Sequence, residues 1–309
     1  MKLSDEQLRA LGNAAQFYAD WQVALSEIPA HSLYWNPAGG HEYLASTSSA
    51  QRSLGRRSPE TEQMYETHTA AKQAAEQRLS AIEARINESA PLWRALRLPS
   101  VDPLTGRILR ELDKGELLGS KILIIGTYAL KAYEVEAADT FATGMDATDD
   151  LDLTLLLGDS SVPRAVLRAL KRVDTNFIVN PNAPTRAVNG SGYRVDLLTT
   201  LAGEKSIDPA FGWRPAPLEG QDWLLLGKPV TTVVVDARGW PVPMIVPDPR
   251  YFALHKLWLS KRRPGPKRAK DERQGEALLE AVRRDMPHYS MDDTFLSSLP
   301  PSLREQWPT

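Results

Sequence analysis

The chain has 309 residues, a formal net charge of −2 and no cysteine. Its 42% hydrophobic and 25% charged residues allow a sizeable core and exclude intrinsic disorder as the class of the whole chain. The lack of cysteine excludes disulfides, thiolate metal sites and cysteine nucleophiles. No apolar run is long enough to span a membrane, and the first residues do not form a signal peptide. We therefore expect a soluble, cytoplasmic protein without a membrane partner.

The N-terminal part predicts a helix followed by a hairpin. Ser4 and Gln7 form a capping box, and apolar residues at helical spacing follow until Pro29. Two apolar and aromatic segments flank residues 36–40, which indicates a hairpin. Residues 46–49 and 53–57 are expected to be loop.

A second helix is predicted to begin at Pro59 and to carry an apolar stripe as far as Ile86. Three prolines interrupt residues 91–103, which predicts a short helix and a connector there. The first hundred residues contain no paired acids at chelating spacing, so we expect no catalytic centre among them.

The middle of the chain predicts a strand, a turn, a helix and another strand. A helix over 103–114 precedes the apolar run 121–125, which ends at Gly126-Thr127. A helix-like stretch over 128–134 follows, and the next strand begins at Asp150. The glycine lets a phosphate approach the backbone, and N–H groups at a helix N-terminus bind phosphate. By itself this signal is weak, because a glycine after a strand is commonly just a turn.

Two aspartates begin this next strand. Because strand side chains alternate between faces, Asp150 and Asp152 share one face while Leu151 and Leu153 point into the core. Neighbouring carboxylates repel each other unless a cation lies between them, and oxygen ligands suit Mg²⁺. The sequence therefore predicts a metal site at this strand.

A third aspartate, Asp196, lies on a strand of a second predicted hairpin, 185–198, with its turn at 189–192. A carboxylate between aliphatic residues is costly to bury unless it is paired or bound to metal. If its strand lies beside the Asp150 strand, three carboxylates converge, as a two-metal site requires. The alternative is that Asp196 pairs with Arg194 or faces water.

The basic run 261–273 carries seven basic and two acidic residues, which leaves a net charge of −7 on the rest of the chain. Such a concentration of positive charge indicates an anionic ligand. Two interpretations stay open, a solvated loop and a surface that holds an RNA or protein substrate. The remaining expected elements are helices over 161–172, 249–262 and 267–284, strands over 231–235 and 244–246, an irregular segment over 203–222, and a surface segment over the last twenty residues.

These elements in this order resemble the DNA polymerase β-like nucleotidyltransferase superfamily. More specifically, the chain is similar over roughly residues 30–285 to a bacterial family of nucleotidyltransferase-fold proteins. The stretches that carry the resemblance are 43–44, 53–62, 126–134, 147–153, 192–197, 246–260 and 267–271.

The resemblance implies an α+β fold in which helices flank a small mixed sheet. It divides the chain into an N-terminal helical region with a hairpin (1–100), a nucleotidyltransferase core (101–248) and a C-terminal helical region (249–309) that completes the nucleotide site. It implies transfer of a nucleoside monophosphate from an NTP such as ATP, with Mg²⁺ or Mn²⁺, to an acceptor hydroxyl. The acceptor would be tRNA or another RNA, a protein or a small molecule. Toxin-like activity and homo-oligomers belong to the same expectation.

Carried over residue by residue, the resemblance assigns metal binding and catalysis to Asp150, Asp152 and Asp196. It assigns the β- and γ-phosphates to Gly126 and Thr127. Two departures from the family pattern are a long connection between Gly126 and Asp150, and Asp149 where a small residue is more usual. Further assignments to the nucleotide are Lys256 and Lys270, the latter in a Lys270-Asp271 pair like that of toxin-type nucleotidyltransferases.

Two rival classes remain. A non-catalytic nucleotide-binding or antitoxin-like module would keep the fold, but the three intact aspartates argue against it. Glycosyltransferases also use Asp-x-Asp, but they usually place a nucleotide-binding half ahead of that motif, whereas residues 1–100 predict helices. His255 and the aromatic residues Tyr251, Phe252 and Trp258 are interpreted as helix packing rather than as ligands of a base.

Overall fold

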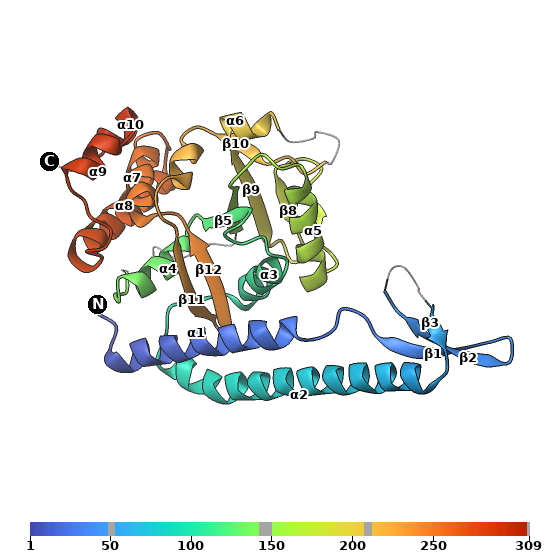
Figure 1. Ribbon diagram of the computed structural model, residues 1–309. Coiled ribbons are helices and arrows are strands. Elements are labelled where there is room, and N and C mark those ends of the chain that lie inside the picture. The colour runs from blue at the N-terminus through green and yellow to red at the C-terminus, as the bar shows by residue number, and fades with distance from the viewer. Residues whose placement is uncertain (49–52, 142–149, 207–211, 308–309) are drawn as a thin grey trace. The chain divides into compact units, whose positions relative to one another are not determined.

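The computed structural model describes residues 1–48, 53–141, 150–206 and 212–307. The chain divides into two compact units, one made of Met1–Ala15 with Ala90–Thr309 and the other of Gln16–Ser89. Both units contain helices and small sheets, and the sheets of the larger unit are mixed (Figure 1). The α+β class expected from the sequence is confirmed. In the described part of the chain, no helix has the length and apolar character needed to cross a membrane.

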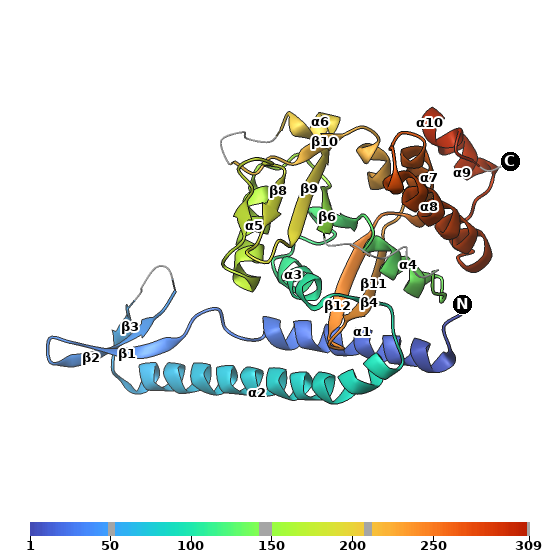
Figure 2. The ribbon, with the colours of Figure 1, turned by 180° about the vertical axis from the view of Figure 1, so that it is seen from behind.

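The larger unit is built on a six-stranded sheet in the order β5-β6-β9-β8-β7, with β10 added beside β9. β6 and β9 are parallel, and β5 and β8 run antiparallel to their neighbours. Figure 2 shows β6 next to β9 from behind. The strand bounds are β5 Ile122–Ile125, β6 Asp150–Leu155, β7 Ile178–Val179, β8 Arg186–Val188, β9 Arg194–Thr200 and β10 Ala216–Leu218.

A second sheet of the larger unit has the order β12-β11-β4. Helices α3 and α5 pack against each other, and α4 packs on β11 and β12. The bounds are β4 Ser100–Val101, β11 Val230–Asp236, β12 Pro241–Val246, α3 Pro103–Lys114, α4 Ala129–Glu136 and α5 Ser161–Val173. Both sheets and these helices share one apolar core, because their inward-facing aliphatic residues form a single buried cluster.

The C-terminal helices close one side of the same core. α7 (Pro249–Ser260) and α8 (Pro266–Asp285) lie against each other, and α10 (Pro301–Arg304) packs on α7. Gly275 permits the close helix contact, since a Cβ there would meet the Ala253 carbonyl oxygen at 2.9 Å and the Leu257 side chain at 2.8 Å. The remaining short elements are α6 Leu201–Glu204, the 3₁₀ helix η2 Gln221–Leu225 and α9 Asp293–Ser298.

The smaller unit contains a three-stranded antiparallel sheet in the order β1-β2-β3. The expected hairpin is present, with Gly39 and Gly40 at its turn in the left-handed region. Parts of two helices belong to this unit and hold each other there through the Trp21 indole N–H, which donates to Glu83 at 3.2 Å. The bounds are α1 Asp5–Ser26, β1 Leu33–Ala38, β2 His41–Ser46, β3 Ser53–Arg56 and α2 Pro59–Ala95.

Four local predictions were wrong. The segment 203–222, expected to be irregular, contains β10 and the start of η2. Residues 53–56 form strand β3 rather than loop, because they pair with β2. α2 continues through Pro91, where the buried neighbours Ala90 and Trp93 keep the helix packed although proline lacks an N–H donor. The last twenty residues are not a surface segment, since they form α9 and α10. Their core contacts come from three buried side chains, Phe295, Leu299 and Leu303.

Candidate active site

Strands β6 and β9 bring the predicted acidic residues together. In the parallel register of the two strands, Asp152 is the partner of Asp196 and Asp150 is the partner of Arg194. Side chains at paired positions lie on the same face of a sheet, so Asp150, Asp152 and Asp196 face the same side. Leu151 and Leu153 are fully buried on the opposite face.

The electrostatics of Asp152 reflect this crowding. Burial raises the pKa of the Asp152 carboxyl to about 6, and the negative charges of Asp150 and Asp196 push it in the same direction. Lys256 and Arg263 act against this shift. A carboxylate in such a place is stabilised by any additional positive charge.

Asp196 is already paired with an arginine. Arg186, its partner across the β8–β9 ladder, donates from Nε to Oδ1 and from Nη2 to Oδ2, both at 2.7 Å. Arg194 approaches Asp150 instead, at 3.7 Å between Nη2 and Oδ2. The expected alternative, a pair between Asp196 and Arg194, is therefore not formed. Among the described residues, no three His, Cys, Asp or Glu side chains lie in an arrangement that could hold a metal ion.

Gly126 ends β5 directly beside the acidic face. Its φ of +70° is in the left-handed region, and a Cβ on it would overlap the carboxylate of Asp152. No side chain other than hydrogen fits between the turn and that carboxylate. Thr127, with an exposed fraction of 9%, follows the glycine, and α4 begins two residues later. The strand, the glycine and the helix that follow one another in the sequence therefore form a tight backbone turn next to Asp152.

A polar cluster next to this turn was not predicted from the sequence. Asp102 caps α3 by accepting from the N–H groups of Leu104 and Thr105, both at 2.9 Å. The Tyr128 hydroxyl donates to the same carboxylate, and the Tyr193 hydroxyl is hydrogen-bonded to the Thr105 side chain. Burial raises the pKa of both tyrosines, so they stay protonated. The cluster ties the start of α4 and the residue before β9 to one helix end.

Basic side chains from α7, α8 and the connection between them line the opposite wall. Lys256, with an exposed fraction of 7%, donates from Nζ to Asp271 Oδ1 at 2.8 Å. Arg263 donates to the other oxygen of Asp271 at 3.1 Å. Burial lowers the pKa of Lys270, and the charge of Lys256 lowers it further. These groups and Lys267 share a cavity of about 110 Å³ with Gly126, Thr127, Asp150 and Asp152.

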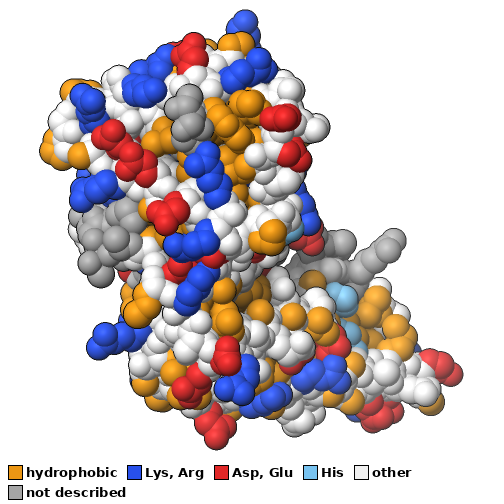
Figure 3. Space-filling view, turned by 90° about the vertical axis from the view of Figure 1, so that its left-hand side faces the viewer, with side chains coloured by type: hydrophobic (Ala, Val, Ile, Leu, Met, Phe, Trp, Pro, Cys, Tyr) orange, Lys and Arg blue, Asp and Glu red, His pale blue; other side chains and the backbone are white. Residues whose placement is uncertain are grey.

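The basic residues of the run 261–273 fall into two groups, those that line the polar cavity and those that do not. Arg263, Lys267 and Lys270 line this polar cavity, whereas Arg268 and Arg273 are exposed and do not. On the face that Figure 3 shows, basic side chains alternate with acidic ones and with an apolar patch. The sequence alone could not separate Lys267 from Arg268, because the two are adjacent basic residues and only Lys267 lines the cavity.

An apolar cavity of about 270 Å³ adjoins the polar one, and both include Gly126, Asp152, Lys256 and Arg263 in their lining. His255 lines the apolar cavity, and burial lowers its pKa to about 3, so its imidazole is neutral. Phe252 and Trp258 line it as well, although both were expected to serve in helix packing alone. Gln221 was also missed, and nothing in its local sequence distinguishes it. Asp149 lies outside the described residues.

A family model described as a nucleotidyltransferase matches residues 103–300. The chain belongs to this nucleotidyltransferase family. The matched range begins with α3, ends after α9 and contains every residue that lines the two cavities. No curated protein and no solved structure matches the chain.

Proposed function

We propose that this nucleotidyltransferase transfers a nucleoside monophosphate from an NTP to an acceptor hydroxyl, with a site of the DNA polymerase β-like type. The acceptor oxygen would attack the α-phosphorus, the bond from that phosphorus to the β-phosphate oxygen would break, and pyrophosphate would leave. The observation that carries the proposal is one small cavity with Asp150 and Asp152 on one side and Lys256, Lys267 and Lys270 on the other. Carboxylates and ammonium groups so arranged suit a metal-bound triphosphate.

The donor atoms are of the kind that a divalent cation prefers, although the three carboxylates are not arranged around one ion position while Arg186 holds Asp196. Asp150 and Asp152 offer carboxylate oxygens on one face, the pKa of Asp152 is raised by burial and by nearby negative charge, and Asp196 stands in register beside it. Asp150, Asp152 and Asp196 are thus the residues that would hold Mg²⁺ or Mn²⁺. When bound, such a cation would lower the pKa of the acceptor hydroxyl and stabilise charge on the leaving pyrophosphate.

The remaining residues of the chain would bind and orient the nucleotide. Gly126 and Thr127 let the phosphates approach the backbone at the start of α4, because only hydrogen fits beside Asp152 at the glycine. The ammonium groups of Lys256, Lys267 and Lys270 would neutralise the triphosphate. Proton transfer from the acceptor hydroxyl would end on one of the aspartates or on water.

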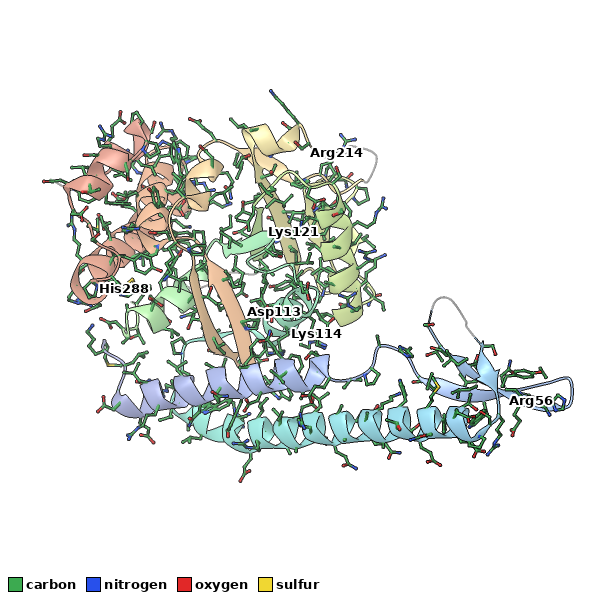
Figure 4. All side chains as sticks on the ribbon, in the orientation of Figure 1. Arg56, Asp113, Lys114, Lys121, Arg214 and His288 are labelled. Atoms are coloured by element: carbon green, nitrogen blue, oxygen red, sulfur yellow. The ribbon has the colours of Figure 1, made fainter. Side chains whose placement is uncertain are left out.

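The test uses α-labelled and γ-labelled forms of each NTP with Mg²⁺ or Mn²⁺, and total tRNA or a cell lysate as the acceptor source. Nucleotidyl transfer predicts labelled acceptor from the α-label and labelled pyrophosphate from the γ-label. Asp152→Asn should lose the transfer, whereas Asp113→Asn, at the end of α3 (Figure 4), should keep it. Labelling of the acceptor by the γ-label would indicate a kinase and overturn the proposal.

One observation favours a second candidate, a nucleotide-binding module that does not transfer. Both oxygens of Asp196 accept hydrogen bonds from Arg186, so the guanidinium neutralises this carboxylate without a metal ion. A module of this kind would bind NTP but label no acceptor under any condition of the test above. Binding measured by calorimetry together with absent transfer would select it.

A further inference from the structure

Two residues that line the apolar cavity beside Asp152 each carry a buried N–H donor without an acceptor. Nε2 of Gln221 and Nε1 of Trp258 have no hydrogen-bond partner among the described residues, and the side chains are 1% and 2% exposed. Both residues line this cavity. A buried donor without a partner is costly, so a ligand that brings acceptor atoms to these two groups gains the hydrogen bonds that the protein lacks.

The walls that hold the two donors are rigid. The Trp258 ring stacks on His255 with 5.8 Å between centroids, meets Trp223 edge-on at 4.9 Å, and lies under the Arg262 guanidinium at 4.1 Å. Gln221 begins the 3₁₀ helix η2 after Gly220, where a Cβ would meet the Trp223 ring at 2.9 Å. These contacts hold the Trp258 ring and the start of η2 in place at the cavity.

The position of this cavity indicates what fills it. It shares Gly126, Asp152, Lys256 and Arg263 with the polar cavity that would take the triphosphate. Most of its other lining residues are apolar, such as Ile125, Leu224 and Phe252, and the neutral His255 adds no charge. Glu219 and Arg262 also line it and bring one charge of each sign. A flat, uncharged group joined to a phosphate chain suits these walls, and a nucleobase is such a group.

We infer that this cavity binds the nucleobase of the NTP and that Gln221 and Trp258 donate hydrogen bonds to acceptor atoms on its edge. The inference rests on the proposed function and adds to it the residues that choose the base. The four bases differ in how acceptors and amino donors are arranged on their edges. A pair of fixed donors therefore favours a base that presents acceptors to both, and an amino group facing either donor opposes binding.

The test measures the affinity of the full chain for the four NTPs and for inorganic triphosphate, by calorimetry with Mg²⁺ and without acceptor. The wild-type protein should bind one or two NTPs at least about tenfold more tightly than the others. Gln221→Met removes a donor at similar size and should weaken the preferred NTP about tenfold, leaving inorganic triphosphate unchanged. Trp258→Phe should act in the same way.

Gln306→Met is the matched control, because Gln306 is also a buried glutamine with an unpartnered side-chain atom but does not line this cavity. It should leave every affinity unchanged. If Trp258→Phe fails to fold, the affinities of Gln221→Met for NTP and inorganic triphosphate test the inference, provided that its melting temperature is unchanged.

Three results would overturn the inference. Equal weakening of NTP and inorganic triphosphate by Gln221→Met would make Gln221 a structural residue. Equal affinities of the wild-type protein for all four NTPs would mean that no base is read, while the proposed transfer would still stand. No binding of any NTP or of triphosphate would remove both the inference and the proposed function.

Discussion

The candidate site has two walls, a sheet wall formed by β6, β8 and β9 and a helix wall formed by α7 and α8. The charged side chains of the two walls are neutralised in different ways. On the sheet wall, Asp196 and Arg186 form a pair whose side chains are 14% and 32% exposed. On the helix wall, Asp271 bridges Lys256 and Arg263, and the Asp271 and Lys256 side chains are only 4% and 8% exposed. Water can replace a lost partner on the sheet wall but not on the helix wall. The helix wall therefore contributes to folding and binding together, whereas the sheet wall can change its charges at little cost to the fold.

The largest expected effect comes from breaking the buried pair. Asp271→Asn leaves the Lys256 ammonium buried without its carboxylate, which should lower the free energy of unfolding by about 3–5 kcal/mol. Asp196→Asn on the sheet wall should lower it by less than about 1 kcal/mol. Chemical denaturation of both variants measures the difference. Equal losses would mean that the two walls do not differ as described.

The next effect concerns binding at the helix wall. Lys256→Met keeps the length of the side chain and removes its charge, and Arg263 still pairs with Asp271. Loss of a charge-assisted contact to phosphate should weaken NTP binding by about 1.5–3 kcal/mol in calorimetry.

Lys114→Met on α3 is the matched control for this change, because Lys114 is exposed and lines neither cavity (Figure 4). An NTP affinity that Lys256→Met leaves unchanged would remove this lysine from the nucleotide site.

The sequence predicted the sheet wall better than the helix wall. Alternation along a strand places Asp150 and Asp152 on one face, and the hairpin signal around 189–192 gives the antiparallel partner of β9. These are local patterns of period two, so they can be read without tertiary contacts. The pairing of β6 with β9 needed only the assumption that their strands are neighbours.

Long-range contacts explain what the sequence could not predict. Arg186 pairs with Asp196 through the register of the β8–β9 ladder, and Lys256 meets Asp271 because α7 and α8 pack together. Gln221 lies in a segment that was expected to be irregular, and its burial depends on helices far along the chain. The end of α2 beyond Pro91 was missed for the same reason, since packing outweighs the local preference.

A third effect is a pH dependence from the helix wall. His255 has its pKa lowered to about 3 by burial and by the nearby Lys256 and Arg263, so its proton binds more readily in the unfolded chain. The stabilisation is complete above the unfolded pKa of about 6.5 and is lost as pH falls toward 3, by about 1.4 kcal/mol for each pH unit. His255→Gln should reduce this slope, measured in denaturation curves between pH 6 and pH 4, by about the 1.4 kcal/mol per pH unit that one proton contributes.

His41→Gln is the control for this slope, because His41 is an exposed residue of β2. It should leave the slope of the wild-type protein unchanged. A slope that His255→Gln does not alter would show that other groups cause the acid sensitivity.

The smallest expected effect comes from the sheet wall and concerns Arg186. Arg186→Met removes the positive charge whose two hydrogen bonds neutralise Asp196. Because the pair is partly exposed, the free energy of unfolding should fall by less than about 1 kcal/mol. Removing a cation from beside the three aspartates favours another cation there, so Mn²⁺ should bind several-fold more tightly, or about 0.5–1 kcal/mol. Calorimetric titration of the nucleotide-free protein with Mn²⁺ measures this, with Arg194→Met as a weaker case since its guanidinium is 3.7 Å from Asp150. A lower Mn²⁺ affinity in Arg186→Met would mean that the arginine holds Asp196 in place for the cation rather than competing with it. The Arg186–Asp196 pair would then have a structural role in the sheet wall, as the Lys256–Asp271 pair has in the helix wall.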